Sequence, residues 1–143
     1  MDRKNQVVFL AILLVAAAAT LAFAILPSVA QQSPDQVVQD FYGWYIVYAQ
    51  TANPLVDKAY RSADDLAPAF IARMDEFTSQ PMMFDPILCA QDVPTSISTA
   101  TPVIDGATAT VRVDTSFAGH AFDVQFVQDG KVWQITDVIC STR

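Results

Sequence analysis

The second half of the chain alternates between apolar and polar residues, and this alternation constrains the fold more than any other feature. It runs through three segments, residues 107–115, 122–127 and 132–139. A period of two is typical of strands that bury one face. The dipeptides Asp105-Gly106 and Asp129-Gly130 favour tight hairpin turns between such strands. With residues 97–103 as a further alternating segment, the pattern predicts four strands in an antiparallel meander.

The residues before this region follow a helical pattern instead. Ser33-Pro34-Asp35-Gln36 combines an N-cap residue, a proline suited to the first turn and a glutamine that can close a capping box. A helix is therefore expected from here to about Gln50. Its apolar face recurs at three- and four-residue spacing and comprises Val37, Val38, Phe41, Trp44, Tyr45 and Tyr48.

A second helix is expected to begin near Ser62 or Asp64. Its apolar stripe comprises Leu66, Phe70, Ile71, Met74 and Phe77. Pro68 fits this helix only in the first turn, because a proline further along would remove a backbone hydrogen bond. Residues 55–60, between the two helices, can add a short helical piece.

Residues 81–94 contain three prolines and no regular period, so we interpret them as a connector. The predicted architecture is α+β, with two to three N-terminal helices packed on one face of a four-stranded antiparallel meander sheet. In the third strand, the buried face comprises Phe122, Val124 and Phe126, or it follows the other register through Val127.

The first thirty residues have the order of an export signal. Arg3 and Lys4 precede an uncharged, apolar run over residues 7–26, and Pro27 and small residues through Ala30 follow it. We expect cleavage after Ala30, which leaves residues 31–143 as a single domain. The alternative for residues 1–30 is an uncleaved N-terminal anchor, because twenty helical residues span about 30 Å. Either form exports the domain, which is then periplasmic or secreted, or held at the inner membrane facing the periplasm.

Two cysteines, Cys89 and Cys140, lie in the exported part of the chain. An even number of cysteines in an oxidising compartment predicts one disulfide bond, and the alternative is two buried free thiols. A zinc site is not expected, since there is no Cys-x-x-Cys motif and His120 is the single histidine. His120 itself is expected to be an exposed turn residue beside Gly119.

The charge balance and the glycine pattern exclude several classes of function. Beyond Ala30 the chain has fourteen acidic and six basic residues, which gives a net charge of −8. Such a domain lacks the basic surface that binds nucleic acids or anionic membranes. The four glycines form no phosphate-binding loop, and no calcium-binding motif occurs. No metal and no cofactor is therefore expected, and a membrane is contacted only through an uncleaved N-terminal segment.

Three motifs resemble those of the DUF3828 family of exported bacterial proteins. They are Phe41-Tyr42-Gly43-Trp44-Tyr45, the run from Asp85-Pro86 to Gln91-Asp92, and the ending from Trp133 to Cys140. The order of a helix pair followed by a long antiparallel sheet also resembles the NTF2-like, or cystatin-like, superfamily. The resemblance spans roughly residues 34–140. It implies a cone-shaped fold in a small envelope domain without established catalytic residues, and one in which a homodimer can form.

Nine residues are candidates for a pocket or an interface. They are Tyr42, Trp44, Tyr45, Tyr48, Phe84, Asp85, Gln91, Asp92 and Trp133. The aromatic stripe on the first helix is denser than one core face needs, so some of its rings can line a pocket mouth or an interface. The favoured interpretation is that the stripe packs the helix on the sheet, and the alternative is that Tyr42, Tyr45 or Tyr48 lines such a pocket mouth or interface.

Two functional hypotheses follow. In the first, the domain is a non-catalytic accessory module that binds a small ligand or an envelope protein. In the second, it is a small isomerase or dehydratase whose general base is an aspartate in the cavity, where burial would raise its pKa. Asp85, Asp92 and Asp137 are the residues considered for that base, although Asp85 before Pro86 also suits a cap or an Asx-turn. We favour the binding module because no convergent set of polar groups can be assembled from the sequence.

Overall fold

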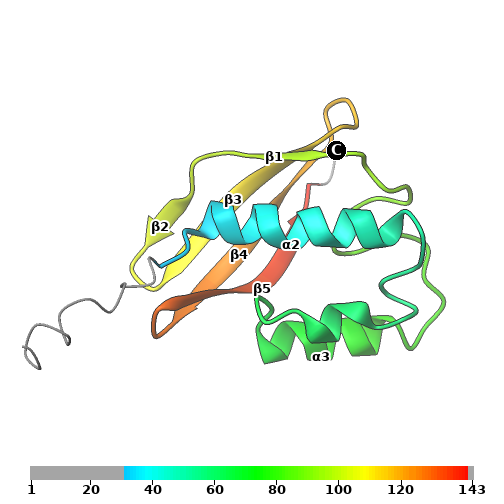
Figure 1. Cartoon of the computed structure of the whole chain (residues 1–143), viewed down its shortest axis with the longest axis horizontal. Coiled ribbons are helices and arrows are strands. Elements are labelled where there is room, and N and C mark those ends of the chain that lie inside the picture. Colours follow the sequence, from blue (N-terminus) through cyan, green and yellow to red (C-terminus); the bar gives the residue numbers. More distant parts are fainter. Residues whose placement is uncertain (1–30, 142–143) are drawn as a thin grey trace, which may run out of the picture. The chain divides into compact units, whose positions relative to one another are not determined.

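The computed structural model describes residues 31–141, which form one antiparallel sheet with helices beside it (Figure 1). The helical elements are α2 (Pro34–Ala49), the 3-10 helix η1 (Ala59–Ser62) and α3 (Pro68–Phe77). The strands are β1 (Ile97–Thr99), β2 (Val103–Asp105), β3 (Thr108–Thr115), β4 (Ala121–Asp129) and β5 (Val132–Cys140). The predicted α+β class, with helices first and strands afterwards, is confirmed.

The expected export segment, residues 1–30, lies outside the described residues. Within residues 31–141, no helix is both long and apolar enough to cross a membrane. The choice between a cleaved signal and an uncleaved anchor therefore stays a prediction.

The sheet has the order β1-β3-β4-β5, and β2 also pairs with β3. The predicted first strand is thus divided into β1 and β2, which gives five strands in place of four. The register against β3 shifts by one residue between the two pieces. Pro102 lies at this shift, where its missing N–H cannot join the ladder. The expected turns at Asp105-Gly106 and Asp129-Gly130 are present, with glycine φ angles of 58° and 60°.

An irregularity in β5 decides which of its residues reach the core. The pairing of β4 with β5 skips Thr136, which is an extra residue in β5. Ile135 and Val138 consequently both pack against the core, although strict alternation would separate them onto opposite faces. In β4, the observed register is the one that buries Phe122, Val124 and Phe126.

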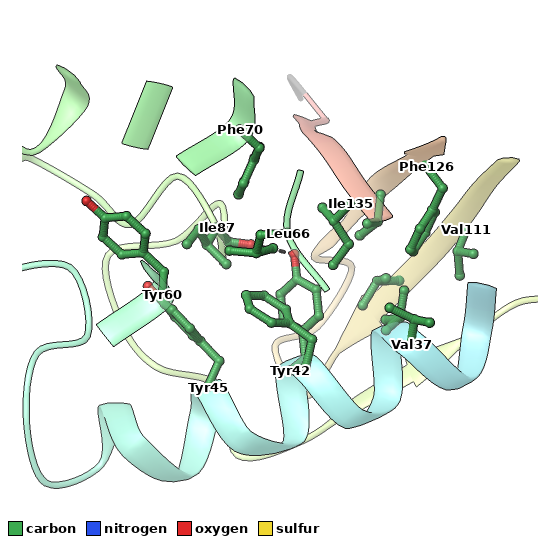
Figure 2. Close-up of a cluster of buried hydrophobic side chains, with 14 of the residues drawn as sticks. Val37, Tyr42, Tyr45, Tyr60, Leu66, Phe70, Ile87, Val111, Phe126 and Ile135 are labelled. Carbon is green, nitrogen blue, oxygen red and sulfur yellow. Dashed lines mark hydrogen bonds between the residues drawn. The ribbon is translucent and has the colours of Figure 1, made fainter. Parts of the chain in front are cut away.

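Helix α2 begins with the predicted capping box. The Gln36 side chain accepts a hydrogen bond from the Ser33 backbone N–H at 3.0 Å. The helix packs against β1 and β3, and it crosses the sheet in Figure 1. Figure 2 shows Val37, Tyr42 and Tyr45 pointing from α2 into a core that also receives side chains from the sheet. Four residues of the predicted apolar face are buried, namely Val37, Val38, Phe41 and Tyr45. Trp44 and Tyr48 of that face remain at least partly exposed, and Tyr42 and Ile46 are buried in addition.

Helix α3 begins at Pro68, later than the predicted start near Ser62 or Asp64. The residue before a proline is disfavoured in helical conformation, and Ala67 is accordingly extended, with φ −65° and ψ 143°. The segment before the helix pairs instead with β5: the Ala67 N–H donates to the Ile135 carbonyl at 2.9 Å, and the Ile135 N–H donates to the Asp65 carbonyl at 2.7 Å. Pro68 occupies the first turn, as its chemistry requires.

Candidate functional site

The connector, residues 81–94, is a folded loop whose centre belongs to the core. Ile87 and Leu88 are 0% and 1% exposed. Figure 2 shows Ile87 among core side chains that come from the helices and the sheet. The loop closes on itself, because the Asp85 N–H donates to the Ala90 carbonyl at 2.8 Å and the Ala90 N–H donates back at 3.3 Å. The sequence predicted only a connector here, and the burial of Ile87 and Leu88 was not expected.

The carboxylate of Asp85 organises the loop from within. Its Oδ1 accepts hydrogen bonds from the backbone N–H groups of Ile87 at 2.7 Å and Leu88 at 3.1 Å, which confirms the expected Asx-turn. Its Oδ2 accepts a hydrogen bond from the Tyr45 hydroxyl at 2.8 Å. Burial raises the pKa of Asp85, although these hydrogen bonds oppose the shift. Burial also raises the pKa of Tyr45, so its hydroxyl remains a donor.

The disulfide bond and His120 hold the far end of the connector. Cys89 and Cys140 form the predicted disulfide, with their Cα atoms 5.4 Å apart. The Nε2 atom of His120 lies 2.9 Å from the Cys89 carbonyl oxygen, and Nδ1 lies 2.9 Å from the Thr115 hydroxyl. A carbonyl oxygen can only accept, so Nε2 carries a proton. The expectation that His120 is an exposed turn residue is therefore wrong: the ring is half-buried and ties β3 and the turn after it to the connector.

Several of the predicted interface aromatics belong to the core instead. Tyr42 and Tyr45 are 0% exposed, and Trp133 is 6% exposed, so these rings are closed to a partner. The Tyr42 hydroxyl donates to the Ile87 carbonyl at 2.9 Å, which adds another anchor for the connector. For these residues, the favoured interpretation that the aromatics pack the fold is the correct one. The physical reason is that the connector covers this part of α2, and no sequence period records that contact.

Two other aromatic residues of α2 remain accessible. Trp44 is 37% exposed, and Tyr48 is partly exposed with its hydroxyl 3.1 Å from the Asp57 carboxylate. Neither residue lines the pocket described below, so the structure does not join them to the other candidates.

A pocket of about 250 Å³ opens between the connector and the chain that leaves α2. We call it the connector pocket. Its lining comprises Ala49, Ala52, Asn53, Pro54, Leu55, Met82, Met83, Phe84, Asp85, Leu88, Gln91, Asp92 and Val93. Four of the nine candidate residues meet here, namely Phe84, Asp85, Gln91 and Asp92. These four residues come together because they belong to, or flank, one closed loop.

Three exposed apolar side chains lie among the residues that line the pocket. Met83 is 82% exposed, Phe84 is 42% exposed and Val93 is 37% exposed. The Phe84 ring is held edge-on against Phe77 of α3, with the ring centroids 5.7 Å apart. The exposed carboxylate of Asp92 adds a negative charge to this surface. Met83 is not among the nine candidates, although it belongs to an apolar run between Pro81 and Pro86 that could have indicated it.

The acidic residues considered as a general base do not converge. Both oxygens of Asp85 already accept hydrogen bonds from the protein. Asp137 lies apart from the pocket lining, on β5, where Arg73 donates to its carboxylate at 2.9 Å. Among residues 31–141, no group of three or more histidine, cysteine or acidic residues could hold a metal ion. The carboxylates of Asp85 and Asp137 are thus already engaged in contacts within the fold.

Comparison with known proteins identifies a similar fold. No family model matches this chain, and no curated protein does either. Among solved structures, the chain is similar to a chain in the crystal structure of the type VI native effector–immunity complex Tae3–Tai3 from Ralstonia pickettii, with a TM-score of 0.64 and 21% sequence identity. The match covers 79% of this chain and 98% of that chain. The two proteins thus share an α+β fold over almost the whole of the matched chain.

Proposed function

We propose that the protein is an exported accessory module that binds another protein through the connector pocket. The observation that supports this most directly is the similarity to a chain of an effector–immunity complex, which covers 98% of that chain. A domain of this fold therefore occurs in a protein–protein complex. An immunity-type role, in which the module binds an effector protein, is the specific form that we propose.

The connector pocket has the properties of a protein-binding surface. Its rim presents a methionine and an aromatic ring, residue types enriched at the centres of interfaces. Hydrogen bonds, a disulfide and two buried side chains hold the loop in place, so little conformational entropy is lost when a partner binds. Since the domain is acidic and Asp92 lies on the rim, we expect the partner to present apolar residues with a lysine or arginine among them.

The disulfide supports the proposed location. A bond between Cys89 and Cys140 persists in an oxidising compartment such as the periplasm. We therefore propose an exported protein with a cleaved signal at residues 1–30. Its assignment to the DUF3828 family, with an NTF2-like cone, belongs to the same proposal and rests on the three motifs named above.

The proposed function can be tested by affinity capture with matched variants. The purified exported protein would be immobilised and exposed to an envelope extract of the cell that makes it, beside Met83→Asp and Val132→Asp variants. Val132 is a suitable control because it is 53% exposed on β5 and does not line the pocket. We expect one protein to be retained by the wild type and by Val132→Asp but lost with Met83→Asp. Equal retention by all three, or no retained protein, would contradict the proposal.

A further inference from the structure

A second hollow, of about 610 Å³, lies between α2 and the outermost strand β1. We call it the edge groove. Its lining comprises Gln39, Gly43, Ile46, Val47 and Gln50 of α2, and Thr95, Ser96, Ile97, Ser98 and Thr99. None of these residues carries a charge, although the chain beyond Ala30 has a net charge of −8. The edge groove therefore differs in chemistry from the connector pocket, which contains two aspartates.

The backbone of β1 has unused hydrogen-bonding positions beside this groove. The Ala100 N–H donates to the Arg112 carbonyl at 2.9 Å, and the Ser116 N–H donates to the Ser96 carbonyl at 3.0 Å. In an antiparallel ladder the residues that face the neighbouring strand alternate, so the N–H and C=O groups of Ile97 and Thr99 point away from β3. Among residues 31–141, no strand pairs with that side of β1.

The side of the groove that α2 forms has no side chain at its centre, because Gly43 lies there. A Cβ atom added at Gly43 would meet no heavy atom within 4 Å. Val47, one turn further along α2, is 64% exposed. At the N-terminal end of this side, the Gln39 side-chain amide donates to the Thr99 hydroxyl at 3.0 Å and joins helix to strand. An open, uncharged space thus lies directly beside an unpaired strand edge.

We propose that the edge groove accepts an extended segment of a partner protein as an additional strand beside β1. The added backbone would exchange hydrogen bonds with Ile97 and Thr99, as in β-strand addition generally. Its side chains facing α2 would be uncharged and mainly apolar, because a charge there would lose water without gaining a partner. This surface is separate from the connector pocket, so the inference goes beyond the proposed function.

The charge of the domain favours a partner segment over a second copy of this chain. Two copies would each bring a net charge of −8 and would repel one another. A flexible uncharged segment meets no such repulsion. The break at Pro102 also limits the open edge to a short stretch, which suits a segment of a few residues better than a long strand.

The first test uses a displayed library of random ten-residue peptides, selected on the purified protein. We expect enriched peptides to be uncharged at every second position. In amide hydrogen exchange, the best peptide should slow the Ile97 and Thr99 amides at least tenfold, while the Ser98 amide, already paired with β3, should change little. Failure to enrich any peptide, or protection that maps elsewhere, would overturn the proposal.

Two variants test the same groove in different ways. Thr99→Pro removes an outward N–H without taking a hydrogen bond from β3, and Gly43→Arg fills the open space. Each should weaken peptide binding at least tenfold, whereas Val132→Thr and Met83→Asp should leave it unchanged. Thermal unfolding shows whether each variant is folded. If Thr99→Pro is unfolded, peptide binding by Gly43→Arg is the test of the proposal. Unchanged binding by the folded variants, or a dimer in light scattering that Thr99→Pro dissolves, would overturn the proposal.

Discussion

The sheet and the connector both bury apolar side chains, but they hold their backbones in different ways. In β3, β4 and β5, a ladder interrupted only at Thr136 pairs successive residues of adjacent strands. In the connector, one carboxylate, two tyrosine hydroxyls, one histidine and one disulfide hold the loop. The ladder distributes its stability over many similar contacts, whereas each anchor of the connector has no substitute. We therefore expect single changes to open the connector while the sheet remains folded.

The largest expected effect follows from removing the disulfide. Cys89 and Cys140 are 51 residues apart, and closing a loop of that length stabilises by about 4 kcal/mol in the chain-entropy model. Reduction of the wild type, or the Cys89→Ala/Cys140→Ala variant, should lower the free energy of unfolding by about that amount in urea titrations. Amide exchange should speed up first in the connector and the end of β5. Uniform acceleration across β3 and β4 would contradict the proposed difference between the regions.

A matched pair of truncations compares the two regions directly. Ile87 in the connector and Ile135 in β5 are both 0% exposed. We expect Ile135→Ala to cost about 4 kcal/mol and Ile87→Ala about 3 kcal/mol, because a loop collapses into the cavity more readily than a strand within a ladder. Urea unfolding measures both values. A larger loss at Ile87 would show that the connector is the more rigid of the two regions.

A turn in the sheet should respond more weakly. Gly130 has a φ of 60° in the β4–β5 hairpin, a conformation that costs an L-residue about 1 kcal/mol. Gly130→Ala should therefore lower the free energy of unfolding by about 1 kcal/mol without changing exchange in the connector. Gly43→Ala is the matched control, since α2 tolerates a Cβ there and alanine favours helix. Stabilisation by Gly130→Ala would contradict the assigned turn geometry.

The smallest expected effects are opposite pH dependences at two aspartates. Burial raises the pKa of Asp85, so the folded state takes up that proton first, and stability falls as pH rises through the raised pKa. Hydrogen bonds from Arg61 and Tyr60 lower the pKa of Asp75 to about 2, so its contribution is present above the unfolded value and is lost as pH falls toward 2.

Asp85→Asn and Asp75→Asn should each remove one of these dependences. The measurement is the free energy of unfolding in urea between about pH 2 and pH 7, a range that covers the ordinary pKa of aspartate and the lowered pKa of Asp75. Asp75→Asn should reduce the loss of free energy of unfolding at acidic pH. Asp85→Asn should remove the increase in free energy of unfolding that protonation of Asp85 gives as the pH falls. If Asp85→Asn steepened that increase, the assigned burial of its carboxylate would be wrong.

Local chemistry predicted most of the regular structure. The two Asp-Gly turns, the capping box at Ser33 and the alternating segment that forms β3 all depend on residues close together in the chain. The start of α3 and the break between β1 and β2 were missed, although Pro68 and Pro102 marked both. The amphipathic pattern extended N-terminal to Pro68 and the alternating pattern extended past Pro102. In both places the backbone restriction that the proline imposes determined the structure.

The candidate site was predictable only in part. Phe84, Asp85, Gln91 and Asp92 were among the nine candidates, and they lie together because a single short loop carries them. Core packing of the helix aromatics was expected, but the contacts of Tyr42 and Tyr45 with the connector were not, since that loop lies about forty positions further along the chain.

By itself, the sequence determined the order of helices and strands, the hairpins, the acidic charge and the pair of cysteines, because each depends on composition or on local spacing. Only the tertiary structure decided that the connector enters the core, that His120 binds the Cys89 carbonyl, and that β1 leaves an open edge beside α2. These features depend on hydrogen bonds and packing between residues 31 or more positions apart. Such contacts produce no regular spacing of residues in the sequence, so they can be identified only in the folded structure.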